Sequence, residues 1–308
     1  METETTIRKG VELGSGGFAH VFRAVQSDTQ RVVALKQSRV SRQLKRPPLQ
    51  HEAKVLKLLS GHPGVPEIYA YGRIDHFELI SMQLLHRSLR DVVQEDGPLG
   101  VKTVANMADQ MMRSNTFIPM DLSTAISSQT ISIMLQSPGS WKLCLIDFGL
   151  AHRLPSLVAS TTSTTLADSG PVPDRTAHVF GTLPFASLNA HEKNPQLAFR
   201  DDLESLAYTL LWLLRGSLPW SHYASNGNRV GRTRQVHAQK KRHTGSTLGT
   251  ELPVEFGELV DYARLLSVDE KPDYDEWRRR FKQVEAPAAG NDASMSRPKT
   301  PDPQGKAL

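Results

Sequence analysis

The sequence has one cysteine, no long apolar run and almost no excess charge. The single cysteine, Cys144, excludes a disulfide framework and a cysteine-based metal cluster, and it favours a reducing compartment. No apolar run approaches the roughly 20 residues that span a bilayer, and we expect no signal peptide at the polar start. The 37 basic and 32 acidic residues leave a formal charge of +5, which permits acidic partners without requiring them. We therefore expect a protein of the cytoplasm, with the nucleus as the alternative, that has no membrane partner.

The apolar share of 39% in 308 residues is enough for a substantial core. Residues 7–83 contain short strand-like apolar runs and one helical stretch, whereas residues 84–283 show mainly helical periodicity. This change predicts an α+β, two-lobed architecture, with a small β-rich N-lobe over 7–83 and a larger helical C-lobe over 84–283. Residues 284–308 are rich in proline, alanine, glycine and serine, which predicts a disordered tail.

Within these lobes the hydrophobic pattern predicts individual elements. The stretch Leu206–Leu214 is apolar on nearly every face, so we expect a buried central helix that Gly216 and Pro219 terminate. The expected strands lie within 7–36, at 65–71 and at 77–82, and the expected helices lie at 49–59, 88–93, 101–113, 202–214 and 256–266.

A glycine cluster, Gly14-Ser15-Gly16-Gly17, lies between two expected strands. Glycines at such a turn let backbone N–H groups approach phosphate oxygens closely, although a plain tight hairpin turn explains them equally well. The cluster leads into a strand and not into a helix, which argues against a dinucleotide-binding fingerprint.

Three charged residues change the interpretation of that turn. Lys36 ends an apolar strand, Glu52 lies on the following helix, and Asp147 opens the tripeptide Asp147-Phe-Gly149 after another apolar strand. Taken singly, each is explained as a surface charge or a loop residue. The order of glycine loop, strand lysine, helix glutamate and D-F-G matches the protein-kinase pattern, in which the lysine meets nucleotide phosphates and the aspartate binds Mg²⁺.

Four further segments narrow the resemblance. The segment Phe180–His191, with G-T-x-x-F-A-S-x-N-x-H, stands where most kinases carry A-P-E. Together with Arg200–Leu206, Gly216–Trp220 and Lys271–Tyr274, it resembles the casein kinase I family of Ser/Thr protein kinases. The resemblance covers residues 7–283, the expected kinase-like domain.

The resemblance implies a fold that binds ATP and Mg²⁺ between its lobes. Lys36 and Glu52 would form the catalytic ion pair, and Asp147 would be the metal ligand. Asp202 would fasten the catalytic-loop backbone, or serve as a helix N-terminal acid. The expected ATP-binding residues are Leu13, Gly14, Ser15, Gly16, Gly17, Phe18, Val21, Ala34, Lys36, Met82 and Leu84.

The resemblance also implies protein substrates, namely acidic or already phosphorylated Ser/Thr segments, and a monomeric kinase. Basic side chains that would meet such a phosphate are Arg175, Lys240, Lys241 and Arg242. A solvated basic loop or a nuclear-import patch explains these residues equally well. No aromatic residue is interleaved in the basic stretch 229–242, so we expect no specific nucleic-acid partner.

The catalytic loop departs from the family pattern. A motif of the form H-[RG]-D-x-x-x-x-N belongs between Arg113 and Asp147, but residues 114–134 do not contain it. Asp121 is the one carboxylate of this segment; its spacing to Asp147 does not fit, and no asparagine follows five residues later. Two functions therefore remain open: an active kinase, or a catalytically dead pseudokinase that binds ATP or partner proteins.

The codons of this segment offer an explanation. One possible codon string for residues 114–132, read two bases later, encodes Q-Y-I-H-S-H-G-F-V-H-G-D-I-K-P-N-N-F, which resembles a casein kinase I catalytic loop. The shifted aspartate codon falls across Ala125 and Ile126. We hypothesise that residues 114–134 are an out-of-frame reading, from a gene-model error, an altered splice or a mutation; the alternative is a real loss of the loop.

Overall fold

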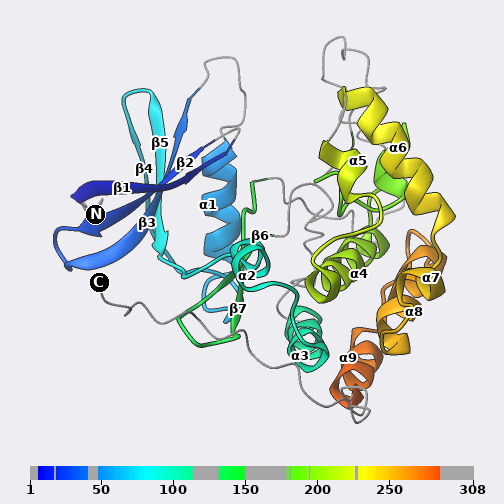
Figure 1. Ribbon diagram of the computed structural model, residues 1–308. Helices are drawn as coiled ribbons and strands as arrows, with labels where there is room; N and C mark the ends of the chain where they lie inside the picture. Colours follow the sequence, from blue (N-terminus) through cyan, green and yellow to red (C-terminus); the bar gives the residue numbers. More distant parts are fainter. Residues whose placement is uncertain are drawn as a thin grey trace, which may run out of the picture.

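The computed structural model describes residues 6–16, 19–40, 48–113, 132–149, 179, 182–193, 195–225 and 228–284. These residues form an N-terminal β-sheet with one helix and a C-terminal lobe of helices (Figure 1). The predicted α+β, two-lobed architecture is confirmed.

The N-lobe is a five-stranded antiparallel sheet whose strand order is β1-β2-β3-β5-β4. Helix α1 (Pro48–Leu58) contacts β4 and β5 on one face of this sheet. Apolar residues alternate along β3, so the sheet buries side chains on both faces: Ala34 joins the core shared with α1, while Val33 and Leu35 form a smaller cluster on the other face. The strands are β1 (Ile7–Ser15), β2 (His20–Gln26), β3 (Arg31–Arg39), β4 (Ile68–Ile74) and β5 (Phe77–Gln83).

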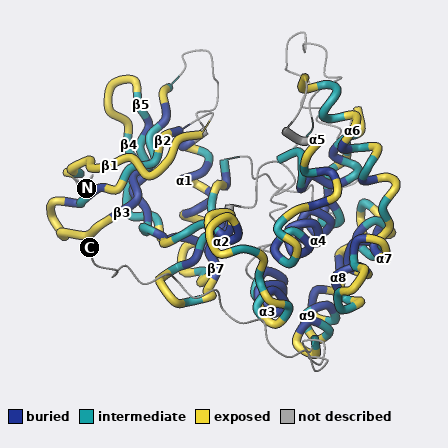
Figure 2. The backbone as a smooth tube through the Cα atoms, viewed as in Figure 1, coloured by how far each residue is buried: buried dark blue, intermediate teal, exposed yellow. Residues whose placement is uncertain are grey.

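The C-lobe is built around helix α4 (Phe199–Arg215), which is buried along most of its length (Figure 2). Its apolar residues face every direction because other helices surround it, and Gly216 ends it with a left-handed backbone at φ 72°. The predicted buried central helix is confirmed. The other helices of the lobe are α2 (Leu89–Asp96), α3 (Val101–Met111), α5 (Ser221–Ser225), α6 (Arg229–Arg242), α7 (Gly245–Leu248), α8 (Val254–Leu265) and α9 (Tyr274–Gln283), of which α8 and α3 contact α4.

A two-stranded hairpin of β6 (Ser132–Leu135) and β7 (Leu143–Ile146) connects the lobes. The Leu145 amide donates to the Gly64 carbonyl at 2.8 Å, and the Gln136 side chain donates to the Pro63 carbonyl at 2.5 Å. These two bonds attach the hairpin to the loop that follows α1. Strand β7, which contains Cys144, ends directly before Asp147.

Several elements differ from the predictions. The expected strand at 65–71 begins later, as β4, and the helices α5, α6, α7 and α9 were not predicted. Helix α6 is polar on most of its surface and buries few side chains, such as Val236, so its apolar pattern is too weak to recognise. Helix α9 does have an amphipathic pattern, with Tyr274, Trp277 and Phe281 buried at helical spacing, and the sequence reasoning overlooked it. None of the helices in the described residues is long and apolar enough to cross a bilayer.

Candidate functional site

An ion pair between Lys36 on β3 and Glu52 on α1 lies at the boundary of the sheet and its helix. The Lys36 Nζ is 2.9 Å from Glu52 Oε1 and 2.7 Å from Oε2, so the ammonium donates to both carboxylate oxygens. The side chains are 15% and 3% exposed. Because Glu52 is almost completely buried, the pair fixes the lysine amine in one position.

Asp147 contributes a second carboxylate to this amine. Its Oδ1 lies 3.2 Å from Lys36 Nζ, and the Asp147 side chain is 35% exposed. The Asp147 backbone has φ 74°, in the left-handed region that non-glycine residues adopt at a cost of about 1–3 kcal/mol. The buried Phe148 ring and its amide, which donates to Glu52, hold the chain in this turn. The turn therefore directs the carboxylate toward Lys36.

The titration of Lys36 and of Glu52 is shifted in this site. Burial lowers the pKa of Lys36, but the nearby carboxylates of Glu52 and then Asp147 together raise it by more, so the pKa of Lys36 lies above its usual value. Burial raises the pKa of Glu52, and Lys36 and the Phe148 amide offset that rise only in part. Lys36 is therefore a permanent cation at neutral pH, held between two acids.

The strand register aligns other predicted nucleotide-binding residues with Lys36. Gly14 on β1 pairs with Val21 on β2, and Val21 pairs with Lys36 on β3. Ala34 lies two residues before Lys36, on the same face of the sheet, and it pairs with Met82 on β5. The sheet thus presents one row that runs from the glycine turn to the lysine, with small and apolar side chains beside it.

The remaining predicted residues have different surroundings. Leu13 is 51% exposed, whereas Leu84 is partly buried against the main core just after β5. Asp202 is 4% exposed in the first turn of α4. Ser15 and Gly16 are exposed at the end of β1, where the Gly16 amide donates to the Ala19 carbonyl at 2.9 Å. Gly17, Phe18, Asp121, Arg175 and the tail from residue 285 lie outside the described residues.

One prediction about the basic residues is wrong. Lys240 is not available to a substrate phosphate, because it is 0% exposed and donates to backbone carbonyls inside the C-lobe. The residues around it belong to helix α6 and not to a loop. Through Lys240 this helix contacts the segment at 182–191. Lys241 and Arg242 are exposed, and Lys241 lies 3.8 Å from Glu192.

Sequence reasoning missed a polar group beneath this segment, made of Glu204, Tyr208 and Arg264. The Glu204 carboxylate accepts from Arg264 Nε at 2.9 Å, from the Tyr208 hydroxyl at 2.5 Å and from the Leu188 amide at 3.0 Å. The one signal of such a group in the sequence is a glutamate within a stretch expected to form a buried helix, because a buried charge needs polar partners.

The donor set at Asp147 fits magnesium and no preassembled metal cluster. Among the described residues, no group of three or more His, Cys, Asp or Glu side chains is arranged to hold a metal ion. A single carboxylate suits Mg²⁺, because this ion is usually held by one or two carboxylates together with substrate phosphates and water. A cavity of about 530 Å³ lies elsewhere, behind the β6–β7 hairpin, where Met111, Trp141 and Leu145 line it.

The comparisons with known proteins agree with this geometry. A model of the protein kinase domain matches residues 7–271. The chain is 32% identical over 291 residues to casein kinase I homolog 3 of Schizosaccharomyces pombe, an alignment that covers 89% of this chain and 61% of the relative. The chain thus spans about three fifths of the length of that relative.

Proposed function

The chain belongs to the protein kinase family, in its casein kinase I branch, and from this premise we propose that it is an ATP-dependent Ser/Thr protein kinase of casein kinase I type. The observation that carries the proposal is that the largely buried side chain of Lys36 contacts both Glu52 and Asp147. Lys36 and Glu52 come from consecutive elements and Asp147 lies 111 positions after Lys36, and their arrangement matches the phosphate and metal site of protein kinases.

Each charged residue has a distinct role in the proposed ATP site. The Lys36 ammonium binds phosphate oxygens, Glu52 holds it extended, and Asp147 holds the metal ion. When bound, Mg²⁺ neutralises charge on the phosphates. The row from Gly14 to Lys36 supports this proposal, because it places the glycine-containing end of β1 in register with the lysine. Ala34 and Met82 would contact the adenine ring.

Acidic or already phosphorylated protein segments are the proposed substrates. Support comes from α6, which contains no acidic residue and presents Lys241 and Arg242 at its exposed C-terminal end. We further propose a monomer that has no specific nucleic-acid partner and works in the cytoplasm, with the nucleus as the alternative.

A second candidate function is a pseudokinase that binds ATP without transferring phosphate. The observation that favours it is the sequence of residues 114–134, which contains no histidine, no H-[RG]-D motif and no correctly spaced asparagine. Without that aspartate, no group is positioned to accept the proton of the substrate hydroxyl. For the chain as written we expect weak ATP binding and phosphate transfer near background.

Nucleotide binding is tested first, by thermal unfolding with and without ATP in the presence of Mg²⁺ or a chelator. We expect Mg-ATP to raise the melting temperature, because a ligand that binds only the folded state stabilises it. Asp147→Asn removes the magnesium-dependent part of this shift, whereas Asp275→Asn, at a side chain 77% exposed on α9, leaves it intact. If Mg-ATP leaves the melting temperature of the wild-type chain unchanged, the proposed site is refuted.

Phosphate transfer is tested with radiolabelled ATP and an acidic casein-type peptide. The informative variant replaces the 18 residues 114–131 with the out-of-frame peptide Q-Y-I-H-S-H-G-F-V-H-G-D-I-K-P-N-N-F. We expect background transfer from the chain as written and clear transfer from the variant. Robust transfer by the unmodified chain that Asp121→Asn abolishes would identify Asp121 as the base and would overturn this expectation. Transcript sequence across the segment tests the frame hypothesis directly.

A further inference from the structure

The side chain of Lys240 on α6 is completely buried and is used entirely within the C-lobe. Its Nζ donates to the Leu183 carbonyl at 2.8 Å and to the Ala186 carbonyl at 2.6 Å, and it lies 3.5 Å from His191 Nε2. Burial lowers the pKa of Lys240 to about 7. An amine at that pKa still donates two hydrogen bonds when it is neutral, so both carbonyls keep their donor in either protonation state.

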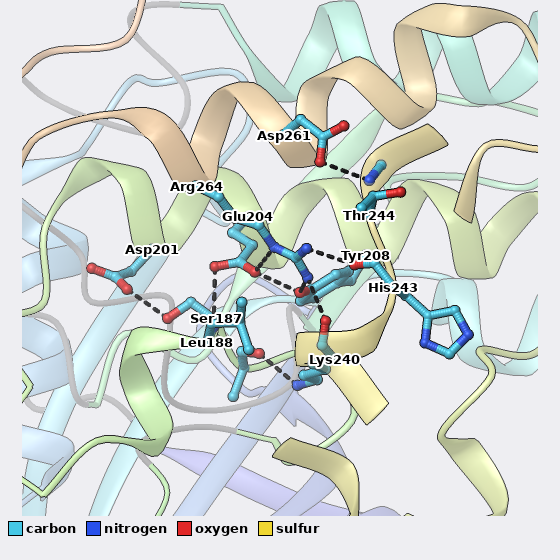
Figure 3. A network of polar contacts seen from close by, with 12 residues as sticks. Ser187, Leu188, Asp201, Glu204, Tyr208, Lys240, His243, Thr244, Asp261 and Arg264 are labelled. Atoms are coloured by element: carbon cyan, nitrogen blue, oxygen red, sulfur yellow. Dashed lines mark hydrogen bonds and ion pairs between the residues drawn. The ribbon is translucent and has the colours of Figure 1, made fainter. Parts of the chain in front are cut away.

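The chain from Thr182 to His191, here named the platform segment, depends on such contacts for its backbone shape. Trp220 Nε1 donates to the Pro184 carbonyl at 2.7 Å, so three carbonyls between 183 and 186 are directed into the C-lobe. Farther along, the Leu188 amide donates to Glu204. The Ser187 hydroxyl donates to Asp201 at 2.5 Å. The segment thus has no regular sheet or long helix, and side chains of the surrounding helices satisfy its backbone (Figure 3).

Lys240 is itself held in place from below. Arg264 on α8 donates to the Lys240 carbonyl at 3.0 Å and to the His243 carbonyl at 2.7 Å, and the same guanidinium binds Glu204 and Tyr208. The Lys240 amine also lies 5.2 Å from the centre of the Tyr208 ring. Two layers of contacts therefore fix the amine against the platform segment.

We propose that Lys240 is a positioning residue for the protein substrate. It keeps the carbonyls of the platform segment turned inward, with Leu183 packed against the core, so that the half-buried remainder of the segment, which includes Leu188, keeps one shape for a peptide. The inference rests on the proposed function, because the platform segment stands at the end of the activation segment of a kinase. It concerns peptide binding only, since the Lys240 amine contacts Leu183, Ala186, His191 and the Tyr208 and Trp220 rings, all of which lie in the C-lobe.

The test compares two dissociation constants in the full chain: that of Mg-ATP, and that of a fluorescein-labelled acidic peptide with one serine. Lys240→Met removes the donors at nearly constant length. We expect it to weaken peptide binding about tenfold or more, because two buried carbonyls lose their partner, and to leave Mg-ATP binding within about twofold. Lys240→Arg, which keeps N–H donors, restores part of the peptide affinity. Lys102→Met, at an exposed position on α3, controls for the lost charge.

Each outcome decides a different question. If wild type does not bind Mg-ATP, the proposed function fails. If wild type binds Mg-ATP but Lys240→Met keeps its peptide affinity, or if wild type does not bind the peptide, the positioning role is refuted while the ATP site stands. If Lys240→Met also loses Mg-ATP binding, its role is general to folding and the inference is wrong. Trp220→Phe, which deletes one donor to Pro184, provides the second variant: we expect it too to weaken peptide binding selectively.

Discussion

Substituting Lys36 by methionine removes more than a phosphate ligand. In the protein without nucleotide, Lys36 is the cation that neutralises Glu52, whose side chain is 3% exposed. Deleting one partner of a buried ion pair typically costs about 3–5 kcal/mol, because the remaining charge is left without compensation. Lys36 itself retains 15% exposure, so we expect the lower end: Lys36→Met should reduce the free energy of unfolding by about 3 kcal/mol at pH 7.

The same reasoning fixes how this loss depends on pH. Burial raises the pKa of Glu52 above that of the unfolded chain, and removing Lys36 raises the pKa further. A carboxyl group with a raised folded pKa destabilises the protein when it is ionised, and the loss disappears as the pH falls through that pKa and the group becomes neutral. The destabilisation by Lys36→Met should therefore be largest at pH 7 and should shrink toward pH 5.

Urea unfolding followed by circular dichroism at pH 7 and pH 5 measures both effects. Lys36→Met with Glu52→Gln removes both charges, and we expect it to recover most of the lost stability at pH 7, since coupling between contacting residues is not additive. A loss below about 1 kcal/mol, a loss that is equal at both pH values, or a double variant no more stable than the single one would refute the reasoning. If it holds, Lys36→Met alone is an unsuitable test of ATP binding.

Three further outcomes are expected. Burial, Lys240 and His237 lower the pKa of His191 to about 2, so below pH 6.5 the unfolded chain binds one more proton than the folded chain. The free energy of unfolding should therefore fall by up to about 1.4 kcal/mol per pH unit on acidification. Urea midpoints at pH 7, 6 and 5 measure this slope, and His191→Asn should flatten it. Gly245→Ala should reduce the free energy of unfolding in urea by more than about 3 kcal/mol, because its Cβ would lie 2.0 Å from the Gly257 carbonyl oxygen. The control Gly72→Ala, whose Cβ would meet nothing within 4 Å, should change it by less than about 1 kcal/mol. Equal losses for the two variants would contradict the packing argument. Burial raises the pKa of the Cys144 thiol to about 12, so a thiol reagent such as dithionitrobenzoate should modify it only in urea, and fast reaction in the native state would show that the strand opens.

The charged residues of the candidate site were predictable because their signals are local. Lys36 and Asp147 each follow directly on an apolar run that predicts a strand, although β3 continues past Lys36 to Arg39, and the strand pattern indicates where their side chains emerge. The glutamate on the next helix needed only the order of elements. The left-handed backbone of Asp147 was not predictable, because it depends on how the buried Phe148 ring packs against the core.

The support of the platform segment could not be predicted, because it depends on contacts between distant residues. Lys240 lies in a basic run of the sequence that indicates exposure, and its burial results from the carbonyls of residues 183 and 186 more than fifty positions earlier. Helix α6 is similarly obscured, because buried Val236 is its one apolar core residue among the described side chains. Such polar burial is decided by tertiary partners and not by periodicity.

The hydrogen bond from Leu145 to Gly64 has a mechanical consequence. It joins the strand that delivers Asp147 to the loop directly after the helix that carries Glu52, so that the two acids share a common support although 95 residues separate them in the sequence. A rotation of the five-stranded sheet that leaves this bond intact would move Lys36, while Glu52 and Asp147 would keep their positions relative to each other. The spacing of the acids would then stay constant, and the amine would be the element whose distance changes.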